Sequence, residues 1–265
     1  MPDEIIEWTG EGSDKEIDDI LGYVLNDDEP YVNFKGRDTR KLGLIVEQMP
    51  DFHRPARRVA QYSIPGGSAP VIADEGGYDP YTTTLKLNAN GRDLHDLYSW
   101  LRGEGWLISG EDPDYKCWAS VYGQITDARF RTAEGVFDTL TVTLLVWPYW
   151  REVDEMGAVI SGESATMQGK GHDKCLPMLT VYGDGPGTLT VNGIEVYFDD
   201  LTSPVILDCE AGAAYSMVNN QPVWKGHTVV MVEGWPELRP EGWNNLFQLA
   251  GGITSVIVQP QWRYL

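Results

Sequence analysis

The amino-acid sequence predicts a mainly β protein, in which an antiparallel α+β unit is followed by a β-sandwich. Short runs rich in β-forming residues, broken by Gly, Pro and Asp, begin at Tyr31 and continue to the C-terminus. One amphipathic helix interrupts these runs in the first half, whereas the second half has strands alone. A polar, Gly- and Ser-rich stretch over residues 151–174 separates the halves. We therefore expect an extension over residues 1–30, an α+β domain over 31–152 and a β-sandwich domain over 153–265.

The N-terminal extension is strongly acidic and contains one predicted helix. Residues 1–29 hold eleven Asp and Glu residues against a single Lys. Within them, the segment "SDKEIDDILGYVL" (13–25) begins with Ser13 and Glu16 at capping-box spacing. Its apolar residues form one stripe: Ile17, Ile20, Leu21, Val24 and Leu25. Because so short a helix is marginal in water, we expect this docking helix to pack on its own domain or on a neighbouring subunit.

The α+β domain is expected to be an antiparallel sheet with a helix against one side. Its predicted strands are "YVNFKG", "LGLIVEQM", "RVAQYSI" and "YTTTLKLNA" before the helix, and "GWLISG" and "YKCWASVYG" directly after it. The helix spans residues 93–103, ends at Gly103 and carries Leu94, Leu97, Tyr98 and Leu101 on one face. The runs "QITDARFRT" and "DTLTVTLLVWPYW" flank the tripeptide "AEG", which predicts a long hairpin.

The predicted sandwich begins with "LPMLTVYG" and "TLTVNGIEVYF". In the second run, Asn192 and Gly193 stand between alternating apolar residues, which is the strongest hairpin signal in the sequence. Four further runs follow at the spacing of a β-sandwich: "PVILDCE", "YSMVNN", "HTVVMVEG" and "ITSVIVQPQWRYL". We expect these strands to enclose the second core of the protein.

The charge of the chain limits its partners. A formal net charge of −20 repels nucleic-acid phosphates and anionic membranes, so we expect no high-affinity DNA binding and no membrane binding. No apolar run approaches the about 20 residues of a membrane span, and the N-terminus lacks a signal-peptide pattern. Cys117, Cys175 and Cys209 are odd in number and far apart, which gives no disulfide framework. We expect synthesis in a reducing cytoplasm.

Signals of catalysis and of cofactor binding are weak. The sequence contains no G-x-S-x-G, no phosphate-binding loop and no H-E-x-x-H. His172 stands three residues before Cys175, and Cys209 is a conceivable third metal ligand, but zinc sites usually have a second close pair. Cys117 lies in a predicted strand and is expected to pack in the core. We therefore expect no enzyme activity, no metal and no cofactor.

The tryptophans indicate an alternative function, which is carbohydrate binding. Trp224, Trp235 and Trp243 lie in segments that resemble loops, and sugars stack on exposed indoles. Most tryptophans, however, are core or interface anchors. The alternative to a structural role is therefore a carbohydrate-binding module that uses the C-terminal β-sandwich.

A basic cluster stands out in this acidic chain. Residues 35–58 carry seven Lys and Arg against three Asp and Glu. Three of the arginines and His53 lie in "PDFHRPARR" at the end of this segment. We call the following residues the basic cluster: Phe52, His53, Arg54, Arg57 and Arg58. Arginines held between prolines suit bidentate pairing with carboxylates, so self-assembly is favoured over phosphate or substrate binding. Alternatively, these arginines only tie their own loop to the sheet.

Several segments together resemble the distal tail protein of phages with long non-contractile tails. They are, in order, "NFKGRDTRKLGLIVEQMPDFHRPARRVAQYSIPGG", "YDPYTTTLKL", "RDLHDLYSWLRGEGWLISGEDPDYKCWASVYG", "FDTLTVTLLVWPYWR", "PMLTVYGDGPGTLTVNGIEVYF" and "VIVQPQWRYL". The resemblance covers residues 31–265. It departs from the family's pattern at the acidic residues before "NFKG" and in the loop before Leu176.

The resemblance implies a structural protein of the virion, located at the tail tip or baseplate. Such proteins form a homohexameric ring, in which the N-terminal domains surround the channel for DNA and galectin-like C-terminal sandwiches point outward. The implied partners are further copies of the chain, the tail tube protein, the tail-tip hub and, through the C-terminal domain, receptor-binding proteins. The basic cluster would then stabilise contacts within the ring or with the neighbouring ring.

Overall fold

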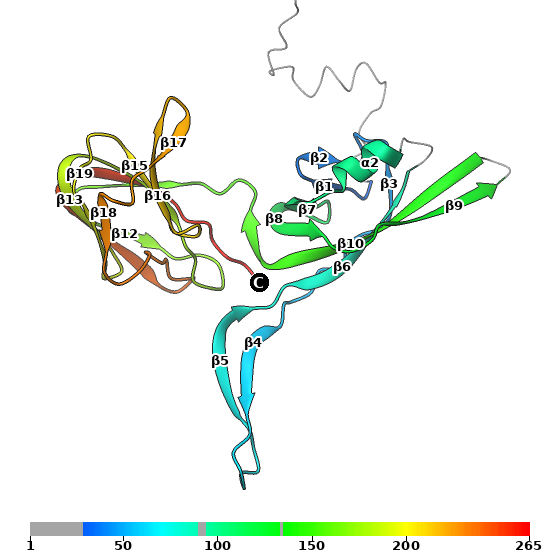
Figure 1. The fold of residues 1–265 in the computed structure, drawn as a ribbon, viewed down its shortest axis with the longest axis horizontal. Helices are drawn as coiled ribbons and strands as arrows, with labels where there is room; N and C mark the ends of the chain where they lie inside the picture. The colour runs from blue at the N-terminus through cyan, green and yellow to red at the C-terminus, as the bar shows by residue number, and fades with distance from the viewer. Residues whose placement is uncertain (1–28, 90–93, 133–134) are drawn as a thin grey trace, which may run out of the picture.

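The computed structural model describes residues 29–89, 94–132 and 135–265, and the predicted docking helix with Ile17, Ile20, Leu21, Val24 and Leu25 lies outside them. The predicted mainly β class is confirmed. Two large antiparallel sheets, a separate two-stranded hairpin and a helix make up the described part of the chain (Figure 1). The two sheets lie at opposite ends of the molecule, and the chain's C-terminus lies between them.

The N-terminal sheet has eight strands, ordered β2-β1-β7-β8-β10-β6-β3, with β9 paired to β10. The strands are β1 (Val32–Phe34), β2 (Arg37–Asp38), β3 (Ile45–Gln48), β6 (Tyr81–Asn88), β7 (Glu104–Ser109), β8 (Asp112–Val121), β9 (Thr126–Thr132) and β10 (Gly135–Glu152). Every neighbouring pair is antiparallel, as predicted.

The helix α2 (Leu94–Trp100) packs on this sheet through the face predicted for it. Leu97 and Leu101 are buried in the N-terminal core, and Leu94 and Tyr98 pack against it. In β10, alternate residues of "LTVTLLV" point into the same core, because successive side chains of a strand face opposite sides. The indole Nε1 of Trp100 donates a hydrogen bond of 2.9 Å to the backbone oxygen of Phe34, which fixes the helix to β1.

Strand β10 links several parts of the N-terminal half. Its first residues pair with β9 from Gly135 opposite Thr132, which confirms the predicted hairpin. Its middle pairs with β6, and its second half pairs with β8 on both sides of a bulge between Val146 and Trp150. A single strand thus runs from the β9 hairpin through the sheet to the start of the C-terminal half (Figure 1).

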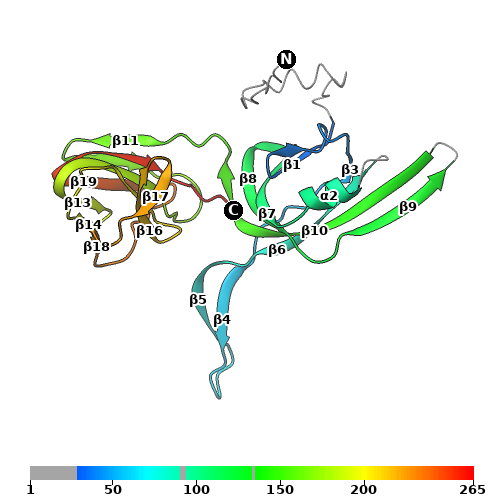
Figure 2. The ribbon, with the colours of Figure 1, turned by 45° about the horizontal axis from the view of Figure 1, so that its top comes forward.

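Strands β4 (Arg57–Tyr62) and β5 (Val71–Tyr78) form a hairpin that pairs with neither sheet. Figures 1 and 2 show it projecting away from both halves of the molecule. Strand β4 was predicted, but β5 was not, because "VIADEGGY" is polar and lacks the alternation of a half-buried strand. All residues of both strands are exposed or only partly covered.

The C-terminal sheet has nine strands, ordered β11-β19-β13-β15-β16-β17, with β12 paired to β19 and β14 joining β13 to β18. The strands are β11 (Ala158–Ser161), β12 (Ser164–Gln168), β13 (Met178–Val191), β14 (Ile194–Phe198), β15 (Val205–Asp208), β16 (Ala213–Val218), β17 (Gln221–Trp224), β18 (Val229–Met231) and β19 (Asn244–Gln259). Buried side chains from them form a second core, with Leu179, Leu189 and Phe247 fully enclosed.

The predicted hairpin at Asn192 and Gly193 is confirmed. Val191 pairs with Ile194, and the two turn residues have φ angles of +52° and +94°. Positive φ at both central positions is the requirement of a type I′ turn, which Asn-Gly meets with little strain.

Sequence reasoning missed two features of this half. Strands β11 and β12 lie within the polar stretch 151–174, where no strand was predicted, and both pair with β19. Trp224 is not in a loop but ends β17, which follows a turn at Asn219 and Asn220. Short strands at the edge of a sheet with few apolar residues give a weak signal in sequence.

Candidate functional site

Two features near the middle of the molecule concentrate charged side chains: the base of the β4–β5 hairpin and the junction between the two sheets. At the junction, the chain's last residues return to the N-terminal half. Trp150 of β10 and Tyr264 exchange two backbone hydrogen bonds of 2.9 and 3.0 Å. The two halves are therefore joined by paired backbone as well as by the connecting segment.

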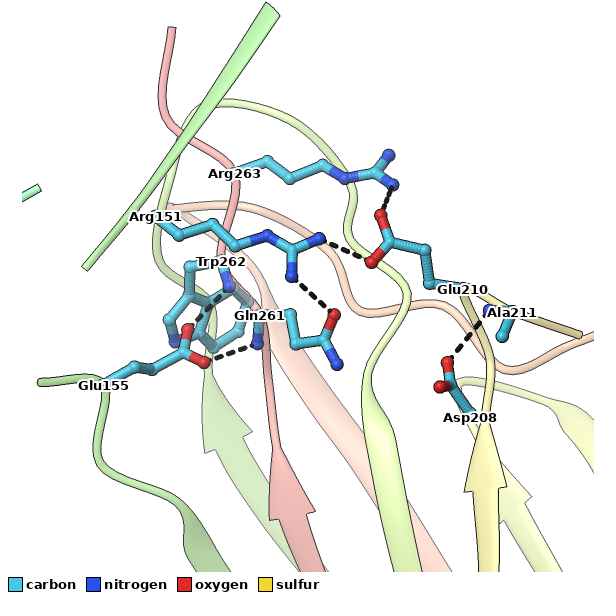
Figure 3. Close-up of polar contacts among 8 residues, drawn as sticks. All are labelled: Arg151, Glu155, Asp208, Glu210, Ala211, Gln261, Trp262 and Arg263. Atoms are coloured by element: carbon cyan, nitrogen blue, oxygen red, sulfur yellow. Dashed lines mark hydrogen bonds and ion pairs between the residues drawn. The ribbon is translucent and has the colours of Figure 1, made fainter. Parts of the chain in front are cut away.

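A charged triad spans the junction (Figure 3). Glu210, in the loop after β15, accepts hydrogen bonds from Arg151 Nη2 at 2.6 Å and from Arg263 Nη2 at 3.2 Å. Arg151 Nη1 also donates to Gln261 Oε1 at 2.9 Å. Burial disfavours the charged form of Glu210 and so raises its pKa. The hydrogen bond and charge interaction with Arg151, and then those with Arg263, outweigh burial. As a result, the pKa of Glu210 lies below its usual value.

Two further carboxylates hold the returning segment. Glu155 accepts the backbone N–H groups of Gln261 at 2.8 Å and of Trp262 at 2.7 Å, and the Trp262 side chain is buried (Figure 3). The Tyr149 hydroxyl donates a 2.7 Å hydrogen bond to Asp173. The pKa of Tyr149 is raised, mainly by burial and secondly by this hydrogen bond. The bond between Tyr149 and Asp173 crosses from one half to the other and helps to fix their relative position, whereas Glu155 holds the returning segment within the C-terminal half.

The aromatic members of the basic cluster pack on the N-terminal sheet. The ring of Phe52 meets Trp150 edge to face, with centroids 4.6 Å apart and planes at 79°. The ring of His53 lies 4.5 Å from that of Tyr81. These two residues attach the base of the hairpin to the sheet beside the junction.

The arginines of the cluster point elsewhere. Arg57 forms an ion pair with Asp74 across the hairpin, and Arg58 pairs with Asp79 at 3.0 Å. The backbone N–H of Gly76, and then Arg57, lower the pKa of Asp74. Arg54 lies on the walls of two neighbouring cavities, of about 500 and 800 Å³. The structure thus brings Phe52 and His53 to the sheet and Arg57 and Arg58 onto the hairpin. Their role in an interface stays a prediction.

The hairpin also carries exposed apolar side chains: Val59, Tyr62, Ile64, Val71 and Ile72. These side chains share the projecting hairpin with the two exposed ion pairs. A projecting arm with both apolar and paired charged side chains is typical of a protein–protein contact.

The three thiols are buried, and one histidine contacts the end of the chain. Burial raises the pKa of Cys117, Cys175 and Cys209 to about 12, so all three are protonated at neutral pH and serve packing, as predicted for Cys117. His172 Nδ1 accepts the backbone N–H of Leu265 at 3.0 Å. Within residues 29–89, 94–132 and 135–265, no group of three or more His, Cys, Asp or Glu is placed to hold a metal ion.

The three tryptophans considered for sugar binding have different environments. Trp224 and Trp243 are exposed, and the guanidinium of Arg239 lies 5.3 Å from the Trp243 ring. Trp235 instead packs against the C-terminal core. In the described part of the chain, no helix is long and apolar enough to cross a membrane.

The charged triad of the junction was missed by sequence reasoning. Arg151 lies 59 residues from Glu210 and 110 residues from Gln261 in the sequence. No local sequence motif therefore contains Arg151 together with either partner. The available signal was the run "VWPYWRE", in which aromatic residues are followed by two charged residues at the place where β10 leaves the sheet.

Comparison with known proteins supports the resemblance at the level of the fold. No protein-family model and no curated protein matches the chain. The solved structure of the Dit protein of phage SPP1, described as a paradigm of the hub adsorption apparatus in phages that infect Gram-positive bacteria, matches with a TM-score of 0.64. The match covers 89% of this chain and 99% of that chain, at 14% identity. The chain therefore has the fold of a Dit protein, as its sequence predicts.

Two structures of a phage P2 baseplate in its activated conformation also match, one with Ca and one with Sr. Their TM-scores are 0.45 and 0.42, at 9% and 8% identity; the matches cover 89% and 88% of this chain and 99% of each matched chain. At these scores the two likenesses add no further argument.

Proposed function

We propose that this chain is a structural distal tail protein of a phage with a long non-contractile tail. Six copies form a ring at the distal end of the tail tube, join the tube to the tail-tip or baseplate hub, and leave a channel for DNA. The observation that carries this proposal is the fold shared with the SPP1 Dit protein over nearly its whole length, with a TM-score of 0.64. The protein acts by assembly and catalyses no reaction.

In this proposal, residues 31–152 form the ring and residues 153–265 form a galectin-like sandwich that points outward. Support comes from the two hydrophobic cores, which have no residue in common and belong to two different sheets. The acidic extension over residues 1–30 is a contact segment for the ring or the tube.

The β4–β5 hairpin and the basic cluster form the contact between copies or between rings. The hairpin projects from the molecule and exposes apolar side chains that its own chain leaves uncovered. Its ion pairs, Arg57 with Asp74 and Arg58 with Asp79, are largely exposed, and such pairs contribute only about 0–1 kcal/mol. Exchanging these intrachain partners for carboxylates of a neighbour therefore costs little, and the chain's net charge of −20 provides such carboxylates.

The remaining partners follow from the position at the tail tip. The ring binds the tail tube protein on one side and the hub or tail-associated protein on the other. The outward domains carry receptor-binding proteins. The protein is a virion component that assembles in the host cytoplasm.

The negative charge has a role in DNA passage. A ring of chains that each carry a net charge of −20 repels the duplex and lets it slide without adhering. We expect no saturable binding of duplex DNA at moderate salt in a filter-binding or anisotropy assay. High-affinity binding under those conditions would rule out this part of the proposal.

Electron microscopy of the purified full-length chain tests the assembly itself. We expect ring-shaped particles with six-fold symmetry and an open centre in negative stain, at high protein concentration. Open filaments or isolated single chains would count against a closed ring, because a head-to-tail contact gives a ring only when its rotation closes.

A further inference from the structure

Three tryptophans line one face of the N-terminal sheet, opposite its core. Trp106 on β7 pairs directly with Trp118 on β8, and Trp147 follows on β10. The strand residues beside them, Leu107 and Cys117, are fully buried in the N-terminal core. Since successive side chains of a strand alternate between faces, the indoles point away from this core and toward the C-terminal half.

A cavity of about 570 Å³ lies against these indoles. Its other wall comes from the C-terminal half, including Asp208 and Gln261. The ring centroids of Trp106 and Trp118 are 5.1 Å apart, and those of Trp118 and Trp147 are 6.0 Å apart. Trp147 remains 48% exposed although the other half packs nearby. The volume lies within the about 300–1,000 Å³ range of small-molecule sites.

The charges of the wall select against an ionic ligand. Three carboxylates, Glu104, Asp208 and Glu210, and two arginines, Arg151 and Arg263, line the cavity. Glu210 pairs with both arginines, so the other two carboxylates remain to disfavour an anion. A cation is disfavoured as well, because Lys116 and Arg151 already lie over the Trp106 ring, at 5.2 and 5.4 Å from its centroid. The wall therefore fits a neutral ligand that offers an apolar face to an indole and hydroxyl groups to carboxylates.

Hydrogen-bonding capacity in the wall is incompletely used. Trp118 Nε1 and Arg263 Nε are buried, and neither has a hydrogen-bond partner. Both groups are donors, and leaving a buried donor without a partner costs about 1–3 kcal/mol.

We propose that this cavity binds a neutral saccharide, with one sugar face stacked on Trp147 and hydroxyl groups donating to Glu104 and Asp208. Indole faces beside fixed carboxylate acceptors supply the two kinds of contact that a sugar needs, one apolar and one polar. This inference does not depend on the proposed ring, since it concerns a cavity within a single chain. It also differs from a sugar site on the C-terminal strands, where Trp224 and Trp243 are exposed.

Saturation-transfer NMR on the full-length chain tests the proposal. The probes are a panel of neutral hexoses, N-acetylhexosamines and their short oligosaccharides, each at millimolar concentration. We expect saturable binding of at least one probe. Trp147→Ala should weaken it roughly tenfold or more, as expected for the loss of one stacking contact, and Trp147→Phe should weaken it less.

Two variants serve as matched controls. Trp224→Ala and Trp243→Ala each remove an indole of similar exposure (60% and 56%) from the other half and should leave binding unchanged. If Trp147→Ala does not fold, Glu104→Gln takes its place, because Glu104 is exposed at the start of β7 and its substitution should weaken binding several-fold.

Three outcomes would overturn the proposal. The first is no binding of any probe in the panel. The second is binding that survives Trp147→Ala and Glu104→Gln but is lost in Trp224→Ala or Trp243→Ala, which would move the site to the C-terminal strands. The third is saturable binding of tetramethylammonium that Trp147→Ala abolishes, with no saccharide binding, which would identify a cation cage.

Discussion

The β4–β5 hairpin and the junction use the same chemistry, arginine paired with carboxylate, in different surroundings. In the hairpin, the side chains of Arg57 and Asp74 are 62% and 44% exposed. At the junction, Arg151 is 18% and Glu210 38% exposed. Water screens the hairpin pairs, whereas the junction pairs are partly shielded and share further hydrogen bonds. Burial thus divides the arginines into a partly shielded set that joins the two halves and an exposed set, for which we propose contacts with a neighbouring copy.

The largest expected effect at the junction comes from removing its aromatic anchor. Trp150→Ala deletes the ring that packs on Phe52, while the backbone bridge to Tyr264 remains. We expect a loss of roughly 2–3 kcal/mol in the free energy of unfolding, measured by urea denaturation. Trp147→Ala, three residues earlier but half exposed, is the control and should cost clearly less. Equal losses would mean that the junction is not specially stabilised.

Breaking the charged triad should have the next largest effect. Glu210→Ala leaves Arg151 and Arg263 without their shared carboxylate. After allowance for the partial exposure of Glu210, we expect a loss of about 1–2 kcal/mol in urea denaturation. Asp79→Ala, which breaks the exposed pair with Arg58, should stay within about 0.5 kcal/mol. If both variants lose the same free energy, the contrast between hairpin and junction does not hold.

Acid should weaken the junction through the same carboxylate. The pKa of Glu210 is lower in the folded protein than in the unfolded chain. Its stabilisation is therefore present above the unfolded pKa, about 4.3, and is lost as the pH falls through the folded pKa. Urea midpoints of the wild type and Glu210→Gln should differ at pH 7 and converge as the pH falls through the folded pKa of Glu210, which lies below the unfolded value of about 4.3. A constant difference across this range would show that the charge of Glu210 contributes nothing.

The smallest effect on stability, and the most informative for assembly, is expected in the hairpin. The double variant Arg57→Glu/Arg58→Glu should prevent self-assembly, as seen by size-exclusion chromatography with light scattering. Normal assembly of this variant would exclude the interface role of both arginines.

An exchanged ion pair separates the interface from the hairpin itself. Arg57→Glu combined with Asp74→Arg retains the pair across β4 and β5 and should change the free energy of unfolding by less than about 0.5 kcal/mol. We expect this variant to assemble poorly, because the charge offered to a neighbour is reversed. If it assembles like the wild type, Arg57 only stabilises its own hairpin.

Much of the fold was predictable because local patterns were strong. The runs on either side of "AEG" identified the β9–β10 hairpin, and Asn192 with Gly193 identified the turn between β13 and β14. The amphipathic face of α2 and the burial of Cys117 followed from the same local rules. The ordered set of segments also led to the correct fold, although identity to the SPP1 Dit protein is only 14%.

The candidate sites were harder to predict because they depend on contacts between distant parts of the chain. Nothing near Arg151 in sequence indicates that Glu210 and Gln261 become its partners. Strand β5 was missed because an exposed arm needs no apolar alternation. The basic cluster was found from composition, but only the structure separates Phe52, which packs on Trp150, from Arg57, which pairs on the hairpin.

The solution mass of the purified full-length chain tests the central claim of self-assembly most directly. Light scattering across a concentration series should show a species of six chains, or a mass that rises toward six chains and stops there. A monomer at every concentration, or a closed assembly of another size, would contradict the homohexameric ring.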